Sequence, residues 1–210
     1  MTYLIGDPVS TEAVVIDPLR CQATLLHALL AEQGLRLKYV LRTHVHRPDT
    51  IDCGDLCTQM EAHYVIGAAN AGDLPGERVR EGDQLAFGEE SLAVIETPGH
   101  TPGCVTYLWR DRIFCGDLLE IGGCAPAVEE TNAGALYDSV RNRIFVLRGE
   151  TLVFPGHDHA MRTVSTVAEE RLTNTAFSGL SRDAFIQHIQ RRERSPDGGH
   201  VLPPKTRRSR

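Results

Sequence analysis

The sequence lacks any long apolar run, and its first residues lack the pattern of a secretory leader. No stretch approaches the ~18 apolar residues of a membrane span, and residues 1–7 show no basic segment followed by a hydrophobic one. The formal net charge is −6, which gives no electrostatic reason to expect nucleic acid or an anionic membrane as the main partner. These absences predict a cytoplasmic protein that acts on a small molecule.

The six cysteines form no C-x-x-C pair, which argues against a common redox or zinc motif. A chain of 210 residues with 41% apolar content can bury a sizeable core without disulfides. We therefore expect reduced, separate thiols. No internal repeat is visible.

Alternating short β-rich runs and helical patterns predict β-sheets covered by helices. The predicted strands span residues 12–17, 37–43, 64–66, 84–87, 92–96, 105–109, 112–114 and 152–154. The predicted helices span residues 22–33, 51–62, 133–145, 164–172 and 182–192. From residue 191 the composition is basic and poor in apolar residues, so we expect a domain over residues 1–190 and a disordered tail over residues 191–210.

Two histidines follow the strand predicted at residues 37–43. His44 and His46 lie two residues apart, and in an extended segment such side chains point the same way. Both imidazoles can therefore face one point beyond the end of the strand.

Three further ligand-type residues follow three other predicted strands. His100 lies in the turn-forming segment Thr97-Pro-Gly-His-Thr-Pro-Gly103, which would hold the imidazole in a tight loop. Asp117 follows the strand at residues 112–114, and His157 follows the strand at residues 152–154. Imidazole and carboxylate together suit iron(II), zinc or manganese, and two histidines with one carboxylate leave positions open for substrate and dioxygen. The alternative is a set of unrelated loop histidines, because the spacing alone is loose.

Four separated motifs resemble the successive signatures of the metallo-β-lactamase superfamily. They are Thr43-His-Val-His46, Thr97-Pro-Gly-His-Thr-Pro-Gly-Cys104, Phe114-Cys-Gly-Asp-Leu-Leu119 and Phe154-Pro-Gly-His-Asp158. Gly123-Cys124 and the stretches at residues 136–145 and 163–171 resemble the persulfide dioxygenase branch, a relative of glyoxalase II. The resemblance implies an α/β (α+β) fold, an αββα sandwich of two mixed sheets flanked by helices.

The resemblance also implies the chemistry. One iron(II), or zinc as the alternative metal, would bind His44, His100 and Asp117. His46 and His157 would lie beside these ligands and orient one of them or a bound water. The reaction would oxidise a low-molecular-weight or protein persulfide to sulfite with dioxygen, and Cys124 and His159 would contact the substrate.

Two departures from the family pattern bear on this expectation. The first family motif reads T-H-x-H-x-D-H, whereas this chain has Pro48 and Thr50 near the places of the aspartate and the last histidine. A two-metal centre would lose two ligands, so one metal is favoured. The family's glutathione-binding arginines are absent after Gly123-Cys124 and around Asn174-Thr-Ala-Phe177, and His159 replaces a tyrosine. These losses predict a thiol carrier other than glutathione.

Three functional hypotheses follow from these patterns. The leading one is an iron(II) persulfide dioxygenase-like enzyme, for which we expect a homodimer. The second is a metal-dependent hydrolase of a thioester or lactone, related to glyoxalase II. The third is a catalytically altered relative that keeps the metal and serves as a binding protein.

Overall fold

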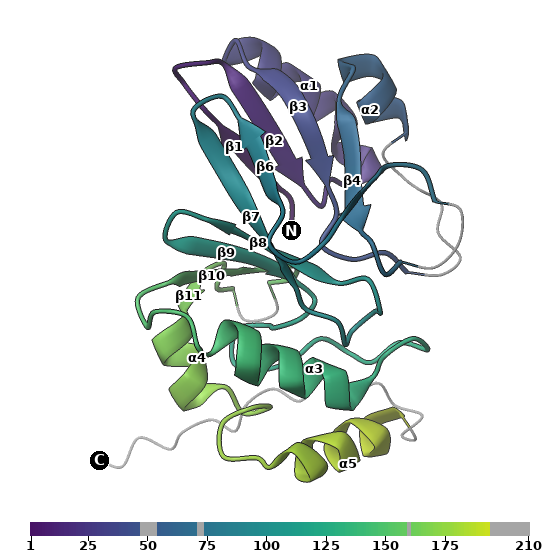
Figure 1. The fold of residues 1–210 in the computed structure, drawn as a ribbon, viewed down its shortest axis with the longest axis vertical. Coiled ribbons are helices and arrows are strands. Elements are labelled where there is room, and N and C mark those ends of the chain that lie inside the picture. The colour runs from purple at the N-terminus through teal and green to yellow at the C-terminus, as the bar shows by residue number, and fades with distance from the viewer. Residues whose placement is uncertain (47–53, 71–73, 159–160, 194–210) are drawn as a thin grey trace.

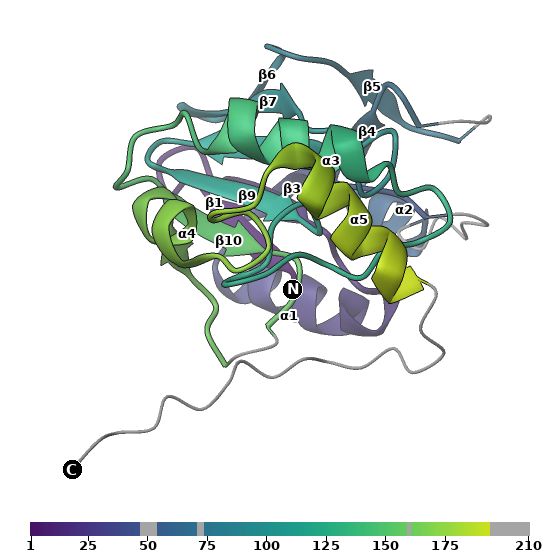
Figure 2. The same cartoon turned by 90° about the horizontal axis from the view of Figure 1, so that it is seen from below.

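Two β-sheets pack against each other in the computed structural model, which describes residues 1–46, 54–70, 74–158 and 161–193 (Figure 1). The first sheet has the order β1-β2-β3-β4-β5, and the second has the order β11-β10-β9-β8-β7-β6. Helices cover the outer face of each sheet (Figures 1 and 2). The fold is therefore the αββα sandwich of two mixed sheets that the sequence predicts.

The first sheet is mainly parallel. Its strands β2, β3, β4 and β5 run parallel to one another, and β1 pairs antiparallel with β2. A helix follows β2 and another follows β3, as parallel crossovers require. The elements are β1 (Tyr3–Gly6), β2 (Glu12–Ile16), the 3-10 helix η1 (Arg20–Gln22), α1 (Ala23–Glu32), β3 (Arg36–Leu41), α2 (Gly54–Met60), β4 (His63–Gly67) and β5 (Glu77–Val79).

The second sheet is mainly antiparallel, with one parallel pair between β9 and β10. Three helices lie on its outer side, and α5 packs beside α3 (Figure 2). The strands are β6 (Gln84–Phe87), β7 (Glu90–Glu96), β8 (Val105–Trp109), β9 (Arg112–Gly116), β10 (Leu152–Pro155) and β11 (Ser165–Thr166). The helical elements are α3 (Ala133–Ser139), the π-helical turn η2 (Val140–Ile144), α4 (Val167–Thr173) and α5 (Arg182–Glu193).

Three apolar layers hold these elements together. One lies between the two sheets and includes Ile16, Tyr107 and Phe114. A second packs α1 and α2 on the first sheet, and a third packs α3, α4 and α5 on the second sheet. Because each sheet is covered on both faces, loops at the strand ends are the places where side chains of both sheets can meet.

The predicted elements need one correction and three additions. The helix expected at residues 164–172 begins only at Val167, because Ser165 pairs with Val153 in the sheet and Thr166 caps α4 by accepting the N–H of Glu169. The short strands β1, β5 and β11 were not predicted. The predicted start of α2 lies outside the described residues.

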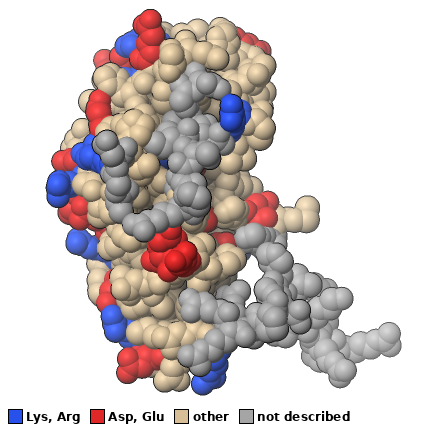
Figure 3. All heavy atoms as spheres, turned by 90° about the vertical axis from the view of Figure 1, so that its right-hand side faces the viewer, with Lys and Arg blue, Asp and Glu red and all other residues tan. Residues whose placement is uncertain are grey.

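Helix α5 ends at Glu193, inside the segment predicted as a tail. Residues 194–210 lie outside the described part of the chain, so the division into domain and tail stays a prediction. No described helix combines the length and the apolar character that a membrane crossing needs. On the face drawn in Figure 3, the described Lys and Arg side chains lie scattered among acidic and uncharged ones.

Candidate metal centre

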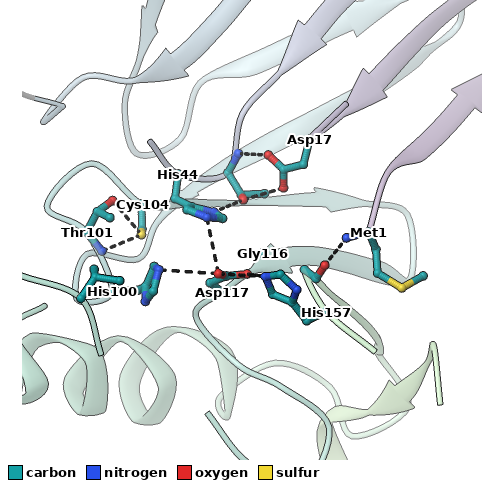
Figure 4. Close-up of polar contacts among 12 residues, drawn as sticks. Met1, Asp17, His44, His100, Thr101, Cys104, Gly116, Asp117 and His157 are labelled. Carbon is teal, nitrogen blue, oxygen red and sulfur yellow. Dashed lines mark hydrogen bonds and ion pairs between the residues drawn. The ribbon is translucent and has the colours of Figure 1, made fainter. Parts of the chain in front are cut away.

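Four ligand-type side chains converge where the two sheets meet, and Figure 4 shows three of them, His44, His100 and Asp117. His44, His46, His100 and Asp117 each offer a donor atom, and these atoms all lie within 4.8 Å of one another. The Nε2 atoms of His44 and His100 both lie 3.6 Å from Oδ2 of Asp117. Of the residues predicted as ligands, the structure therefore brings all three together.

The strand ends explain this convergence. His44 comes shortly after β3 of the first sheet, His100 lies in the turn between β7 and β8, and Asp117 directly follows β9. The first sheet thus supplies one part of the cluster and the second sheet supplies the other.

His44 is oriented by a relay of side chains that begins at the end of β2. Thr43 donates its hydroxyl proton to Oδ2 of Asp17 at 2.6 Å, and its oxygen lies 2.9 Å from Nδ1 of His44. The backbone N–H of Thr43 donates to Oδ1 of Asp17 at 2.9 Å. Because the hydroxyl proton is directed to Asp17, the Thr43 oxygen accepts from Nδ1–H, and the lone pair of Nε2 faces Asp117.

Sequence reasoning missed Asp17, although a carboxylate directly after a buried strand was a usable signal. Its φ of +50° is a strained conformation for a residue other than glycine. The two hydrogen bonds from Thr43 stabilise Asp17 in this strained conformation. Asp17 thus joins the cluster from a strand that the sequence analysis did not connect with the metal.

Glycine at position 116 makes room for this relay. Gly116 has a φ of +54°, and a Cβ built on it would lie 2.1 Å from Oγ1 of Thr43. Gly156 has a similar role behind the carboxylate, since a Cβ there would lie 2.3 Å from Oδ1 of Asp117. Both glycines allow a close approach that any side chain would block.

The loop that carries His100 is held by its main-chain carbonyls. Ser139 donates to the carbonyl of Pro98 at 2.7 Å, and Thr131 donates to the carbonyl of His100 at 3.0 Å. Between them, the N–H of Asn132 donates to the carbonyl of Gly99 at 2.8 Å. Three consecutive carbonyls are therefore fixed by α3 and the segment before it.

The donors fit a divalent transition metal. Nε2 of His100 and Oδ1 of Asp117 are buried and have no hydrogen-bond partner among the described residues. Burial lowers the pKa of His100 to about 4, against the opposing effect of the Asp117 charge, so the imidazole is neutral at neutral pH. A neutral imidazole and a carboxylate with unused lone pairs in a buried site are the groups that such a cation would satisfy.

The two histidines expected beside the ligands are both close. The ring of His46 lies 4.8 Å from that of His44 and 5.0 Å from that of His100, centroid to centroid. The Nε2 atom of His157 lies 3.2 Å from Oδ2 of Asp117, and the His157 side chain is half exposed. His46 is thus grouped with the ligand-type donors, whereas His157 lies on the open side of Asp117.

The residues predicted to contact substrate are less defined. Cys124 is buried, with 5% of its surface exposed. His159, Pro48 and Thr50 lie outside the described residues. The predicted roles of Cys124 and His159 stay predictions.

None of the cysteines in the described part of the chain forms a disulfide. Cys53 lies outside that part. Burial raises the pKa of the Cys104 thiol to about 11, so this residue beside the His100 loop is an inert, protonated thiol at neutral pH.

Comparison with known protein families agrees with this geometry. The profile described as the metallo-beta-lactamase superfamily matches residues 53–157. The chain belongs to the metallo-β-lactamase superfamily.

Within this superfamily, the chain is similar to a persulfide dioxygenase of Homo sapiens, the mitochondrial protein ETHE1. The two are 39% identical over 189 residues, which cover 89% of this chain and 74% of the human protein. The crystal structure of ETHE1 from Myxococcus xanthus superposes with a TM-score of 0.86 at 39% identity, covering 93% of this chain and 87% of that one. The hydroxyacylglutathione hydrolase of Rhodospirillum rubrum is 33% identical over 78% of this chain and 64% of its own length. The branch of the superfamily predicted from the motifs is therefore confirmed.

Proposed function

We propose that this protein is a mononuclear non-haem iron(II) persulfide dioxygenase. The observation that carries the proposal is the set of two imidazoles and one carboxylate that His44, His100 and Asp117 bring together. Such a set leaves coordination positions open for two reactants. The similarity to persulfide dioxygenases over 89% of the chain supports it.

When bound, iron(II) would supply the redox chemistry and hold persulfide and dioxygen side by side. The balanced reaction takes one persulfide, one dioxygen and one water to one thiol, one sulfite and two protons. The persulfide S–S bond breaks, the outer sulfur is oxidised and dioxygen is reduced. No nucleophilic side chain of the protein is required.

The protein's own residues have three tasks in this reaction. The relay from Asp17 through Thr43 keeps Nε2 of His44 aimed at the centre. His100 supplies an uncharged imidazole in a buried loop. His157 is half exposed and touches Asp117, so it is placed to hold or move a proton at Nε2 as reactants enter and leave.

A metal-dependent hydrolase of a thioester or lactone is the second candidate. His46 in the cluster favours it, because three histidines with a carboxylate also suit zinc. Similarity to hydroxyacylglutathione hydrolase points the same way. In that reaction a metal-activated water would attack the carbonyl carbon.

Metal analysis combined with two assays separates these candidates. The protein is purified without added metal or chelator, and iron and zinc are quantified per chain. Samples loaded with iron(II) or with zinc are then assayed for dioxygen uptake with a persulfide and for hydrolysis of a glutathione thioester. The dioxygenase proposal expects about one iron per chain and uptake only in the iron sample. Thioester hydrolysis by the zinc sample without dioxygen uptake would favour the hydrolase.

The thiol carrier and the assembly are further parts of the proposal. We propose that the substrate is a low-molecular-weight or protein persulfide other than glutathione persulfide. We also propose that the enzyme is cytoplasmic and forms a homodimer. Comparing kcat/KM for glutathione, cysteine and cysteamine persulfides tests the carrier. Light scattering tests the dimer.

A further inference from the structure

The backbone that follows Asp117 leaves the second sheet and turns before it reaches Cys124. We call residues 120–123 the strap. Its regular pairing in the described structure is one isolated bridge between Glu120 and Gly123. Buried backbone groups in such an irregular segment need partners from elsewhere.

The end of α4 provides these partners. The side-chain amide of Asn174 donates to the carbonyls of Glu120 at 3.0 Å and Gly123 at 2.9 Å. Oε2 of Glu170 accepts the N–H of Gly122 at 2.9 Å. Each contact joins a side chain of α4 or its C-cap to the main chain of the strap.

The two side chains are buried and hold each other. Asn174 is 0% exposed and Glu170 is 1% exposed. The Asn174 amide also donates to Oε2 of Glu170 at 2.8 Å, and its Oδ1 accepts the N–H of Ala176 at 3.0 Å. The other carboxylate oxygen of Glu170, Oε1, is buried and has no hydrogen-bond partner among the described residues.

A buried carboxylate with one unused oxygen is costly, whereas an apolar side chain of similar size would not be. A role in fixing the conformation of the strap explains why these two polar side chains are buried here.

The strap lies between Asp117 and Cys124 in the sequence. On its near side, Gly116 accepts from the N–H of Gly156, and the thiol of Cys115 donates to the carbonyl of Leu119 at 3.4 Å. Asp117 therefore lies between a fixed strand end and the strap. On the far side, Cys124 follows the strap directly.

We propose that Asn174 and Glu170 are positioning residues that fix the strap and thereby the placement of Asp117 and the protection of Cys124. Their effect on turnover rests on the proposed dioxygenase function. Their effect on the strap does not, so it can be measured without any assay of activity.

We call the side chains of Asn174 and Glu170 the clamp, and three substitutions test it. Asn174→Asp keeps the shape of the side chain but replaces its donating amide group by a carboxylate oxygen. That oxygen would face the carbonyls of Glu120 and Gly123 and the carboxylate of Glu170. Glu170→Leu removes the acceptor for Gly122. Glu170→Gln keeps an acceptor at the place of Oε2 and is the conservative variant. Tyr137→Phe is the matched control, because it removes one hydrogen bond to the carbonyl of Leu180 in the same half of the molecule.

The readout is the rate at which each cysteine of the iron-loaded protein is alkylated by iodoacetamide, resolved by peptide mass spectrometry. Cys124 reports on the strap. The exposed Cys21 gives the alkylation rate of an accessible thiol, and the buried Cys104 and Cys115 detect global opening of the fold. We expect Asn174→Asp and Glu170→Leu to raise the Cys124 rate at least about tenfold with Cys104 and Cys115 unchanged. Glu170→Gln and Tyr137→Phe should stay within about threefold of the wild type.

Iron affinity, measured by chelator competition, completes the test. We expect about a tenfold loss in Asn174→Asp and Glu170→Leu and recovery in Glu170→Gln. Equal acceleration of all buried cysteines would overturn the proposal, because it would mean general loosening. Unchanged Cys124 labelling with unchanged iron affinity in a folded Asn174→Asp protein would overturn it as well. A protein that passes these tests but consumes no dioxygen would contradict the proposed function and leave the clamp intact.

Discussion

The two sheets hold their parts of the metal centre by different means. On the first sheet, His44 depends on a relay of side chains, in which Thr43 and Asp17 each make the next contact possible. On the second sheet, the His100 loop is held by hydrogen bonds to three consecutive main-chain carbonyls. Loss of one member of the relay removes the orientation of His44, whereas loss of one hydrogen bond to the His100 loop leaves two others in place.

This difference predicts that single substitutions near His44 weaken metal binding more than single substitutions near His100. Buried hydrogen-bonded networks behave cooperatively, so loss of one member leaves others without partners. The following variants test this expectation from the largest effect to the smallest.

Removing the carboxylate at the start of the relay should have the largest effect. Asp17→Ala leaves the Thr43 hydroxyl and N–H without their acceptor, so the tautomer and orientation of His44 are no longer fixed. We expect iron affinity to fall about 10–100-fold, measured by chelator competition. Asp17→Asn keeps one acceptor and should lose less. Equal affinities in Asp17→Ala and wild type would show that the relay does not orient His44.

Filling the space behind the relay should have the next largest effect. Gly116→Ala places a methyl group on Thr43 and strains a backbone with φ of +54°. Gly34→Ala is the control, since Gly34 has φ of +64° and nothing within 4 Å of the added carbon. Both variants should lose about 1–2 kcal/mol of stability through strain, but only Gly116→Ala should lose iron affinity, by about tenfold. Matching losses of affinity in the two variants would exclude a steric role for position 116.

Removing one anchor of the His100 loop should have a small effect. Ser139→Ala deletes the contact to Pro98, while Thr131 and Asn132 still hold the next two carbonyls. We expect a loss of about 1 kcal/mol in urea unfolding and less than about a threefold change in iron affinity. Ser139→Ala combined with Thr131→Val should lower affinity by more than the sum of the separate changes. A large loss in Ser139→Ala alone would contradict the shared anchoring.

A contact between the sheets far from the centre should affect stability alone. The N–H of Glu89 and the nearby Ser10 and Val9 lower the pKa of Asp7 to about 2. Since the folded pKa is below the unfolded value, this contribution is present above about pH 4 and is lost as pH falls towards 2. Asp7→Asn should therefore flatten the decline of thermal stability over that range, measured by circular dichroism. Iron affinity at pH 7 should not change.

Much of the fold and of the donor set could be predicted from local sequence patterns. Short β-rich runs separated by turns located the strands at Gln84–Phe87 and Val105–Trp109. The donors follow strand ends, and strand ends of packed sheets meet at an edge. The five residues His44, His46, His100, Asp117 and His157 were therefore predictable as a group, and the resemblance to the family singled out His44, His100 and Asp117 as ligands.

The supports of the centre could not be predicted in the same way. Thr43 and Asp17 are 26 residues apart, and Asn174 and Glu120 are 54 residues apart, so no local pattern joins them. Strand β11 was interpreted as the start of a helix because Ser165 and Thr166 precede a helical pattern. Its pairing with β10 is a tertiary contact that overrides local propensity.

Sulfite production by the iron-loaded protein tests the proposed reaction most directly. Dioxygen uptake and sulfite release are recorded together after addition of cysteine persulfide, with the Asp117→Ala protein as control. We predict one sulfite per dioxygen consumed and loss of both signals in Asp117→Ala. Fully iron-loaded protein that takes up no dioxygen with any persulfide tested, or that releases no sulfite, would contradict the assignment as a persulfide dioxygenase.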